Sequence, residues 1–186
     1  NFAAHAAFLL AEPYFEKFRK IKLELPEAKL KTATREKLNQ LESLVTRYQN
    51  IVSYGDGEWA IAALERLSDV FSIFGSELIA SPVPARFDAK QAEIYKKEIA
   101  SVAQKLFERS LEFLKIGYQK GLELEVTTPV FVALTQRLAL RSLKEYPPAH
   151  YFTNSSGYSY AGTFKDGDWQ GEIARKLKEN PKNAAT

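Results

Sequence analysis

The sequence predicts an all-α protein whose helices stack in antiparallel pairs, followed by a short extension of different composition. Apolar residues recur three and four positions apart through most of the chain, which is the period of an amphipathic helix. Glycines and prolines interrupt this pattern at short breaks that leave room for tight turns. After Pro148 the helical period is lost. We therefore expect about five helices in a domain over residues 1–148 and a separate extension over residues 149–186.

The first two helices are predicted within residues 2–25 and 34–52. Pro13 marks either the start of the first helix or a kink in it, and Pro26 ends it. The second helix carries a single apolar seam. The residues of this seam are Leu38, Leu41, Val45, Tyr48 and Val52.

A tight turn separates the second helix from a third, which is predicted over residues 58–80. Gly55 and Gly57 end the second helix and form the turn. Asp56 is a candidate N-cap, because its carboxylate can accept hydrogen bonds from the free N–H groups that follow. Trp59 then stands at the mouth of the third helix.

The fourth helix is the longest, over residues 89–122. Asp88 and Gln91 have the spacing of a capping box at its start. Its apolar stripe is wide enough to require neighbours on two sides, so we expect it to lie inside a stack. A fifth helix starts at Pro129, with Thr128 as its N-cap, and ends before the sequence EYPP.

The extension is rich in glycine, serine and aromatic residues. The stretch YSYAGTFKDGDWQ alternates aromatic and small residues around Asp166-Gly167, which predicts a β-hairpin. The stretch YAGTFKDGDWQGE resembles a single MORN-type hairpin unit. Because such units occur in arrays, we favour a solitary hairpin or an ordered tail. A short basic helix is expected over EIARKLKEN.

Composition restricts the class of protein. The chain has 186 residues, enough to bury a core without disulfides or metals, and it contains no cysteine. The net charge of +3 is too small to indicate a nucleic-acid surface. No apolar run reaches the length of a membrane span. The chain lacks methionine and begins inside an apolar helical pattern, so we expect it to be part of a longer protein.

The spacing of small and large residues in two of the helices fits the tetratricopeptide pattern. Trp59 followed by Ala63 fits the first helix of such a repeat, and Ala103, Phe107 and Ser110 fit the second. Small residues allow a close approach of two helices, and the aromatic residue fills the space beside them. We therefore interpret Trp59 as a packing residue, rather than a platform for a ligand. The segment from Trp59 to Ala103 exceeds one standard repeat, so we expect about two divergent repeats.

Four stretches carry a resemblance to a known family: YQNIVSYGDGEWAIAALERL, SPVPARFDAKQAEIYKKEI, FERSLEFLKIGYQKGLEL and LKEYPP. Together they resemble tetratricopeptide-type proteins of the bacterial cell envelope, in particular those associated with gliding motility. The resemblance covers roughly residues 2–148. It implies a periplasmic or envelope-associated adaptor that holds other proteins, without catalytic residues.

Candidate partner-binding residues fall into three groups. Acidic side chains on the third helix could line a groove, and residues of the fifth helix could supply the opposite sign in that groove. Aromatic residues of the extension could form an interface patch. These candidates are Glu65 and Asp69, then Gln136, Arg137 and Arg141, then Tyr158, Tyr160 and Trp169. We expect no metal or cofactor, because His5 and His150 are far apart and lie in no metal-binding pattern.

The lead hypothesis is a non-enzymatic scaffold that binds a segment of a protein partner on one face of the stack. The alternative is an enzyme on a helical scaffold that acts on envelope glycan through Glu65, Asp69 or Glu77. A deep pocket with two facing carboxylates would favour the enzyme. Nucleic-acid binding through KFRKIK and RKLK is a weaker third option, since acidic neighbours dilute these short basic runs.

Overall fold

The computed structural model describes residues 2–153 and 159–163. It forms two compact units, Asn1–Leu124 and Glu125–Thr186. Five helices make up most of the described chain, which confirms the predicted helical class. The predicted boundary at residue 148 lies within the second unit.

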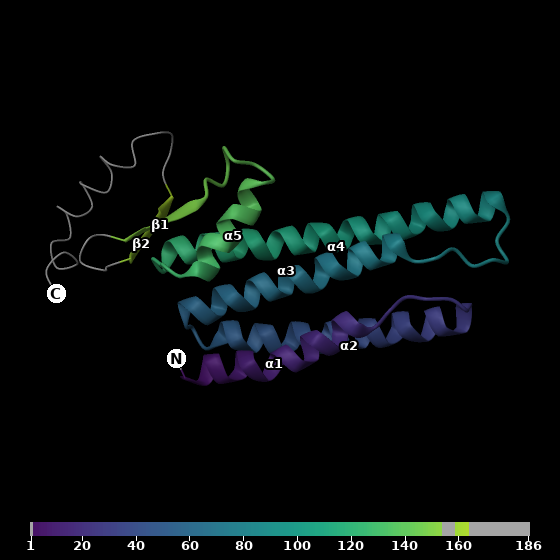
Figure 1. Ribbon diagram of the computed structural model, residues 1–186, viewed down its shortest axis with the longest axis horizontal. Helices are drawn as coiled ribbons and strands as arrows, with labels where there is room; N and C mark the ends of the chain where they lie inside the picture. The colour runs from purple at the N-terminus through teal and green to yellow at the C-terminus, as the bar shows by residue number, and fades with distance from the viewer. Residues whose placement is uncertain (1, 154–158, 164–186) are drawn as a thin grey trace, which may run out of the picture. The chain divides into compact units, whose positions relative to one another are not determined.

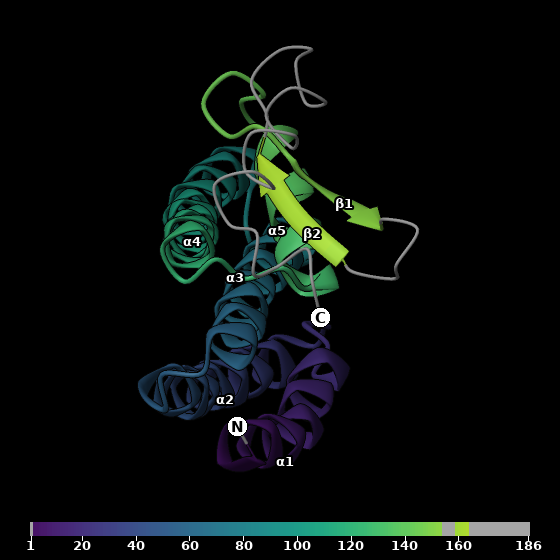
Figure 2. The ribbon, with the colours of Figure 1, turned by 90° about the vertical axis from the view of Figure 1, so that its left-hand side faces the viewer.

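The first unit contains four long helices in which successive helices run in opposite directions (Figure 1). They are α1 (Phe2–Lys20), α2 (Glu27–Ser53), α3 (Gly57–Ala80) and α4 (Ala89–Glu123). The central helix is α3, which packs against α1 and α2 on one side and against α4 on the other (Figures 1 and 2). We expected α4 to have neighbours on two sides; the first unit supplies one extensive neighbour, α3.

Two predicted helix boundaries in the first unit differ clearly from the structure. The first helix ends at Lys20 rather than at residue 25, and Pro13 lies inside it. The second begins at Glu27, well before the predicted residue 34. Residues 27–33 have no apolar seam, but they are mostly glutamate, alanine, lysine and leucine, which all favour helix.

Two of the three predicted caps are confirmed by their side-chain hydrogen bonds, whereas Thr128 stands at the start of the fifth helix without one. Asp56 precedes α3, and its carboxylate accepts a hydrogen bond from the backbone N–H of Trp59 at 3.1 Å. The preceding residue, Gly55, has a φ of +72°, a left-handed conformation that favours glycine. At the start of α4 the Gln91 N–H donates to the Asp88 carboxylate at 2.8 Å. The Asp88 N–H donates to the Gln91 side chain at 3.1 Å and completes the capping box.

The α3–α4 contact depends on small residues, as the spacing predicted. Gly75 lies so close to α4 that an added Cβ would be 2.9 Å from Cε1 of Phe107 and 3.3 Å from the Ala103 carbonyl. Ala103 is fully buried. Further along, the hydroxyls of Ser68 and Ser110 lie 2.8 Å apart in a buried contact. The Ser110 hydroxyl donates to the Ser68 carbonyl at 2.9 Å.

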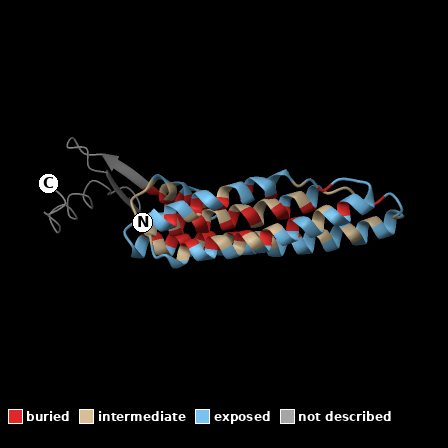
Figure 3. Cartoon of the chain, turned by 90° about the horizontal axis from the view of Figure 1, so that it is seen from below, coloured by how far each residue is buried: buried red, intermediate tan, exposed pale blue. Residues whose placement is uncertain are grey.

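The core of the first unit follows a stripe on α2 that differs from the predicted seam. The buried positions repeat at alternating intervals of three and four between Lys37 and Ile51. Buried residues gather where the helices face one another, and the outer faces of the helices are largely exposed (Figure 3). They are Leu30, Lys37, Leu41, Leu44, Tyr48 and Ile51. Leu38, which we placed in the seam, is 44 % exposed. The predicted seam was partly wrong because Lys37 occupies a core position, and hydrophobic periodicity cannot identify a buried lysine.

Lys37 is completely buried and connects three helices. Its ammonium group donates to the carbonyl oxygens of Phe18 at 3.1 Å and Ile21 at 3.0 Å, at the end of α1. It also forms an ion pair with Glu77 of α3. The ammonium lies 4.5 Å from the centre of the Phe18 ring. Burial lowers the pKa of Lys37, while its contact with Glu77 acts in the opposite direction.

A second polar cluster joins the same three helices. Arg66 of α3 donates to both carboxylate oxygens of Glu12 on α1, at 3.0 and 3.1 Å. The hydroxyl of Tyr48 on α2 donates to the same carboxylate at 3.1 Å. Arg66 also pairs with Asp69 at 3.5 Å. This bidentate arrangement fixes the positions of the three helices more specifically than apolar contact alone.

Trp59 packs against α1. Its ring stacks on His5 with centroids 4.2 Å apart and an interplanar angle of 11°. Phe8 approaches the same ring at 5.3 Å. The structure therefore supports the interpretation of Trp59 as a packing residue.

The second unit contains α5 (Pro129–Ala139), β1 (Ala149–Thr153) and β2 (Ser159–Thr163). The two strands pair antiparallel, with Tyr151 opposite Ala161. The buried hydroxyl of Thr135 connects α5 to β1, because it accepts a hydrogen bond from the N–H of Ala149 at 2.8 Å. The fifth helix ends at Ala139, earlier than expected. The predicted hairpin turn at Asp166-Gly167 and the basic helix lie outside the described residues.

Candidate partner-binding site

The two acidic candidates lie on α3 and are half-buried. Asp69 is engaged by Arg66 in the cluster with Glu12. Glu77, the third carboxylate of the enzyme hypothesis, is paired with the buried Lys37. Asp69 and Glu77 therefore contribute to the packing of the first unit.

The remaining candidates lie in the second unit or outside the described residues. Gln136 and Arg137 belong to α5, and Arg141 follows it. Since Glu65 and Asp69 belong to the first unit, a groove shared by the two groups stays a prediction. Tyr160 lies on β2, opposite Phe152 in register. Tyr158 and Trp169 are outside the described residues.

Metal binding has no support in the described chain. Among residues 2–153 and 159–163, no group of three or more His, Cys, Asp or Glu side chains could hold a metal ion. His5 stacks on Trp59. Within the same residues, no helix is both long and apolar enough to cross a membrane.

A groove lies between the first half of α2 and the connection from α3 to α4, all within the first unit. Its volume is about 410 Å³. This places it toward the lower end of the roughly 300–1,000 Å³ that is typical of ligand pockets. Its apolar lining residues are Leu30, Leu38, Pro84, Phe87 and Tyr95. We call it the α2–α4 groove.

The rim of the α2–α4 groove is mainly basic. Lys31, Arg35 and Arg86 line it, together with Glu27. Arg86 donates to Glu27 at 2.7 Å, so these two charges neutralise each other. Lys31 and Arg35 are exposed, and no ion pair is recorded for them within the described chain. The rim therefore carries two positive charges that a ligand could compensate.

Unequal helix lengths leave this end of the unit open. At about 1.5 Å per residue, the 35 residues of α4 span about 52 Å and the 24 residues of α3 about 36 Å. The first buried residue of α4 is Ala103, so none of the residues 89–102 is buried. Ile94 and Val102 are 55 % and 46 % exposed. The start of α4 thus lacks the packing that α3 gives to its later turns.

One face of α2 contributes several groove residues at helical spacing. Lys31, Thr34 and Leu38 follow one another at intervals of three and four, with Arg35 beside them. This face is adjacent to the buried stripe that contains Lys37. The helical spacing of these groove residues was therefore visible in the sequence, but the predicted seam assigned Leu38 to the core. Arg86, Phe87 and Tyr95 could not be associated with α2 from sequence, because they are distant along the chain.

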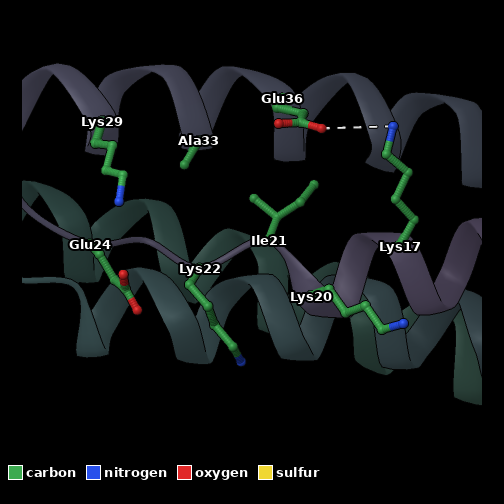
Figure 4. Close-up of a pocket in the computed structure, with 8 residues that line it drawn as sticks. All are labelled: Lys17, Lys20, Ile21, Lys22, Glu24, Lys29, Ala33 and Glu36. Carbon is green, nitrogen blue, oxygen red and sulfur yellow. Dashed lines mark ion pairs between the residues drawn. The ribbon is translucent and has the colours of Figure 1, made fainter.

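The structure has a second pocket, where the end of α1 meets the start of α2, which we call the lysine pocket. It has a volume of about 370 Å³. Lys17, Lys20, Lys22 and Lys29 line it together with Glu24 and Glu36 (Figure 4). Lys17 is paired with Glu36 at 3.7 Å. The ammonium groups of Lys20 and Lys22 point in different directions and away from Lys29 (Figure 4), so they do not converge on one ligand.

Comparisons with known proteins give no support for a family. No protein-family model matches the chain, and the searches of curated proteins and of solved structures return no match either.

Proposed function

We propose that this protein is a non-enzymatic scaffold that binds a segment of a protein partner in the α2–α4 groove. The observation that carries the proposal is the exposed Leu38 beside the half-buried Phe87 and Tyr95 at the open end of a helix stack. Leu38 presents a large apolar side chain to solvent there, beside the aromatic pair Phe87 and Tyr95, whose ring centroids are 5.5 Å apart. Exposed apolar surface rimmed by polar residues is typical of interaction sites.

A repeat-like architecture is part of the proposal. The pairs α1–α2 and α3–α4 are antiparallel, and small residues give the second pair a close contact. A standard tetratricopeptide unit has about 34 residues, whereas α4 alone has 35. We therefore propose elongated, divergent helical hairpins that play the same supporting role.

The proposed location is the bacterial cell envelope, within a motility or other surface complex. This part depends on the sequence resemblance alone. Fractionation of the source organism tests it, since recovery in the cytosolic fraction would contradict it.

No second function is proposed. The glycan-acting enzyme would need two facing carboxylates in a pocket. Asp69 and Glu77 instead form ion pairs with Arg66 and Lys37. The α2–α4 groove contains one carboxylate, Glu27, which is paired with Arg86.

Site-specific photo-crosslinking tests the scaffold function. A photoreactive residue replaces Leu38 in the groove, and a control variant carries it at Gln49, which is exposed on α2 and outside both pockets. In cells of the source organism, we expect a saturable crosslink to one protein from position 38 and none from position 49. The crosslink should disappear when Phe87→Ala is added. Equal labelling from positions 38 and 49 would contradict a binding role for the groove.

A further inference from the structure

We infer that the α2–α4 groove selects an acidic partner segment that carries a large apolar anchor residue. This inference rests on the proposed function and adds the chemistry of the partner. Its two parts come from separate observations: the positive charges of Lys31 and Arg35 on the rim, and the exposed Leu38 beside two half-buried aromatic rings in the lining.

The charge of the rim favours a negative segment. Lys31 and Arg35 are one helical turn apart on α2 and have no recorded ion pair in the described chain, while the charge of Arg86 is already met by Glu27. Carboxylates of a partner would pair with Lys31 and Arg35, whereas lysines or arginines of a partner would be repelled.

The lining favours an apolar anchor. Leu38 is 44 % exposed, whereas Phe87 and Tyr95 are half-buried. The Arg86 guanidinium lies 5.1 Å from the centre of the Phe87 ring. This cation–π contact favours the position of the ring in the lining of the groove. An aromatic or branched aliphatic side chain inserted here would cover Leu38 and displace water from the rings. The α2–α4 groove thus combines a central apolar contact with a charged rim.

The exposure of Leu38 is a consequence of the packing of α2. Its neighbour Lys37 occupies the core position and is held there by Glu77 and by two carbonyl oxygens, one in α1 and one just after it. Because the side chains of adjacent helical residues point about 100° apart, a buried Lys37 directs Leu38 out of the core. The same packing that anchors α1 therefore presents the leucine to a partner.

A peptide-display selection against the full chain tests the inference. The probe is a random library of 16-residue peptides displayed on phage, selected at low ionic strength against the unmodified protein. We expect the enriched peptides to contain Phe, Trp, Leu or Ile flanked by Asp or Glu. A synthetic peptide from the enriched set should bind at least tenfold more weakly to Leu38→Asp and to the double variant Lys31→Glu, Arg35→Glu. Raising the salt concentration should weaken binding.

The control variant Lys105→Glu changes an exposed charge on α4 outside both pockets and should bind like the unmodified protein. Circular dichroism melts confirm that each variant is folded; all the substituted positions are exposed. Enriched peptides without acidic residues that still require Leu38 would overturn the acidic partner and leave the proposed function intact. Failure to enrich any peptide, or binding that none of the groove variants weakens, would overturn both.

Discussion

Two buried polar side chains, Lys37 and Tyr48, hold α1 and α2 together with α3. Each replaces an apolar core residue with a group that bonds to another helix. A buried group of this kind is costly only when its partners are missing, and here the partners are present. The two residues therefore determine the relative positions of three helices, in addition to filling space.

Replacing Lys37 with methionine should lower the free energy of unfolding by about 2–3 kcal/mol, because hydrogen bonds from a charged donor to two carbonyls and an ion pair are lost. Urea unfolding monitored by circular dichroism measures the change. The matched control Lys29→Met removes an exposed lysine of the same helix and should change stability by less than about 0.5 kcal/mol. Equal stability of the two variants would contradict the structural role of Lys37.

The raised pKa of Tyr48 should make the stability of the protein depend on pH. Burial, helped by the negative charge of Glu12, raises the pKa of the Tyr48 phenol above its ordinary value of 10.0. The folded state therefore keeps a proton that the unfolded state releases above pH 10. The contribution of the protonated phenol to the free energy of unfolding is fully present below pH 10. Above pH 10 the free energy of unfolding declines by up to about 1.4 kcal/mol per pH unit.

The variant Tyr48→Phe isolates this effect. At pH 8 it should be about 1 kcal/mol less stable than the unmodified protein, because the hydrogen bond to Glu12 is lost. From pH 9 to pH 11 the difference in unfolding free energy should shrink and then reverse, since only the unmodified protein carries the phenol. A difference that stays constant over this range would show that the pKa is not raised.

Hydrophobic patterning could identify Leu41 and Tyr48 as core residues, but not Lys37. A lysine becomes a core residue only when distant acceptors satisfy its charge, and those acceptors lie on α1 and α3. Periodicity therefore assigned Leu38 to the core and missed its exposure in the groove. This single error also concealed the candidate site.

At the scale of elements, the α3–α4 pair was the most predictable part of the fold. The capping residues before each helix are local signals, and Ala103 and Ser110 marked the close face of α4. Gly75 was not recognised, although it lies close against Phe107 and the Ala103 carbonyl of α4. A glycine inside a helix carries no signal of which neighbour approaches it.

Gly75→Ala should lower the free energy of unfolding by about 1 kcal/mol, as measured by urea denaturation. The gain of about 1 kcal/mol in helix propensity is outweighed by the crowding of the new Cβ against Phe107 and the Ala103 carbonyl. In a Phe107→Leu background, the loss of unfolding free energy caused by Gly75→Ala should be smaller, because the phenylalanine ring is absent. An equal loss in that background would show that contact with the Phe107 ring is not the cause. The exposed neighbour Ser76→Ala is the control and should be neutral or slightly stabilising.

At the scale of the whole molecule, the chain divides at Leu124 into two units with their own contacts. The sequence indicated a boundary at Pro148, where composition changes. Composition could not reveal the hydrogen bond between Thr135 of α5 and Ala149 of β1, because these residues lie on either side of the predicted boundary. The α2–α4 groove was equally hidden, since it joins segments that are far apart in sequence.

A fragment of residues 1–124 should fold on its own, because α1–α4 share one core. We expect a helical circular dichroism spectrum and a single cooperative urea transition. The full chain serves as the reference. A helical spectrum without a cooperative transition would contradict the independence of the first unit.

The projecting start of α4 gives this helix a gradient of local stability. Turns that lack tertiary contacts open by fraying, whereas the turns held by α3 open only with the whole unit. Amide hydrogens of residues 92–102 should therefore exchange with deuterium orders of magnitude faster than those around Phe113 and Leu114, which are buried against the rest of the protein. An occupant of the groove would slow exchange at the projecting turns first. Hydrogen exchange at the start of α4, measured by mass spectrometry, can therefore report whether the α2–α4 groove is occupied before any partner is identified.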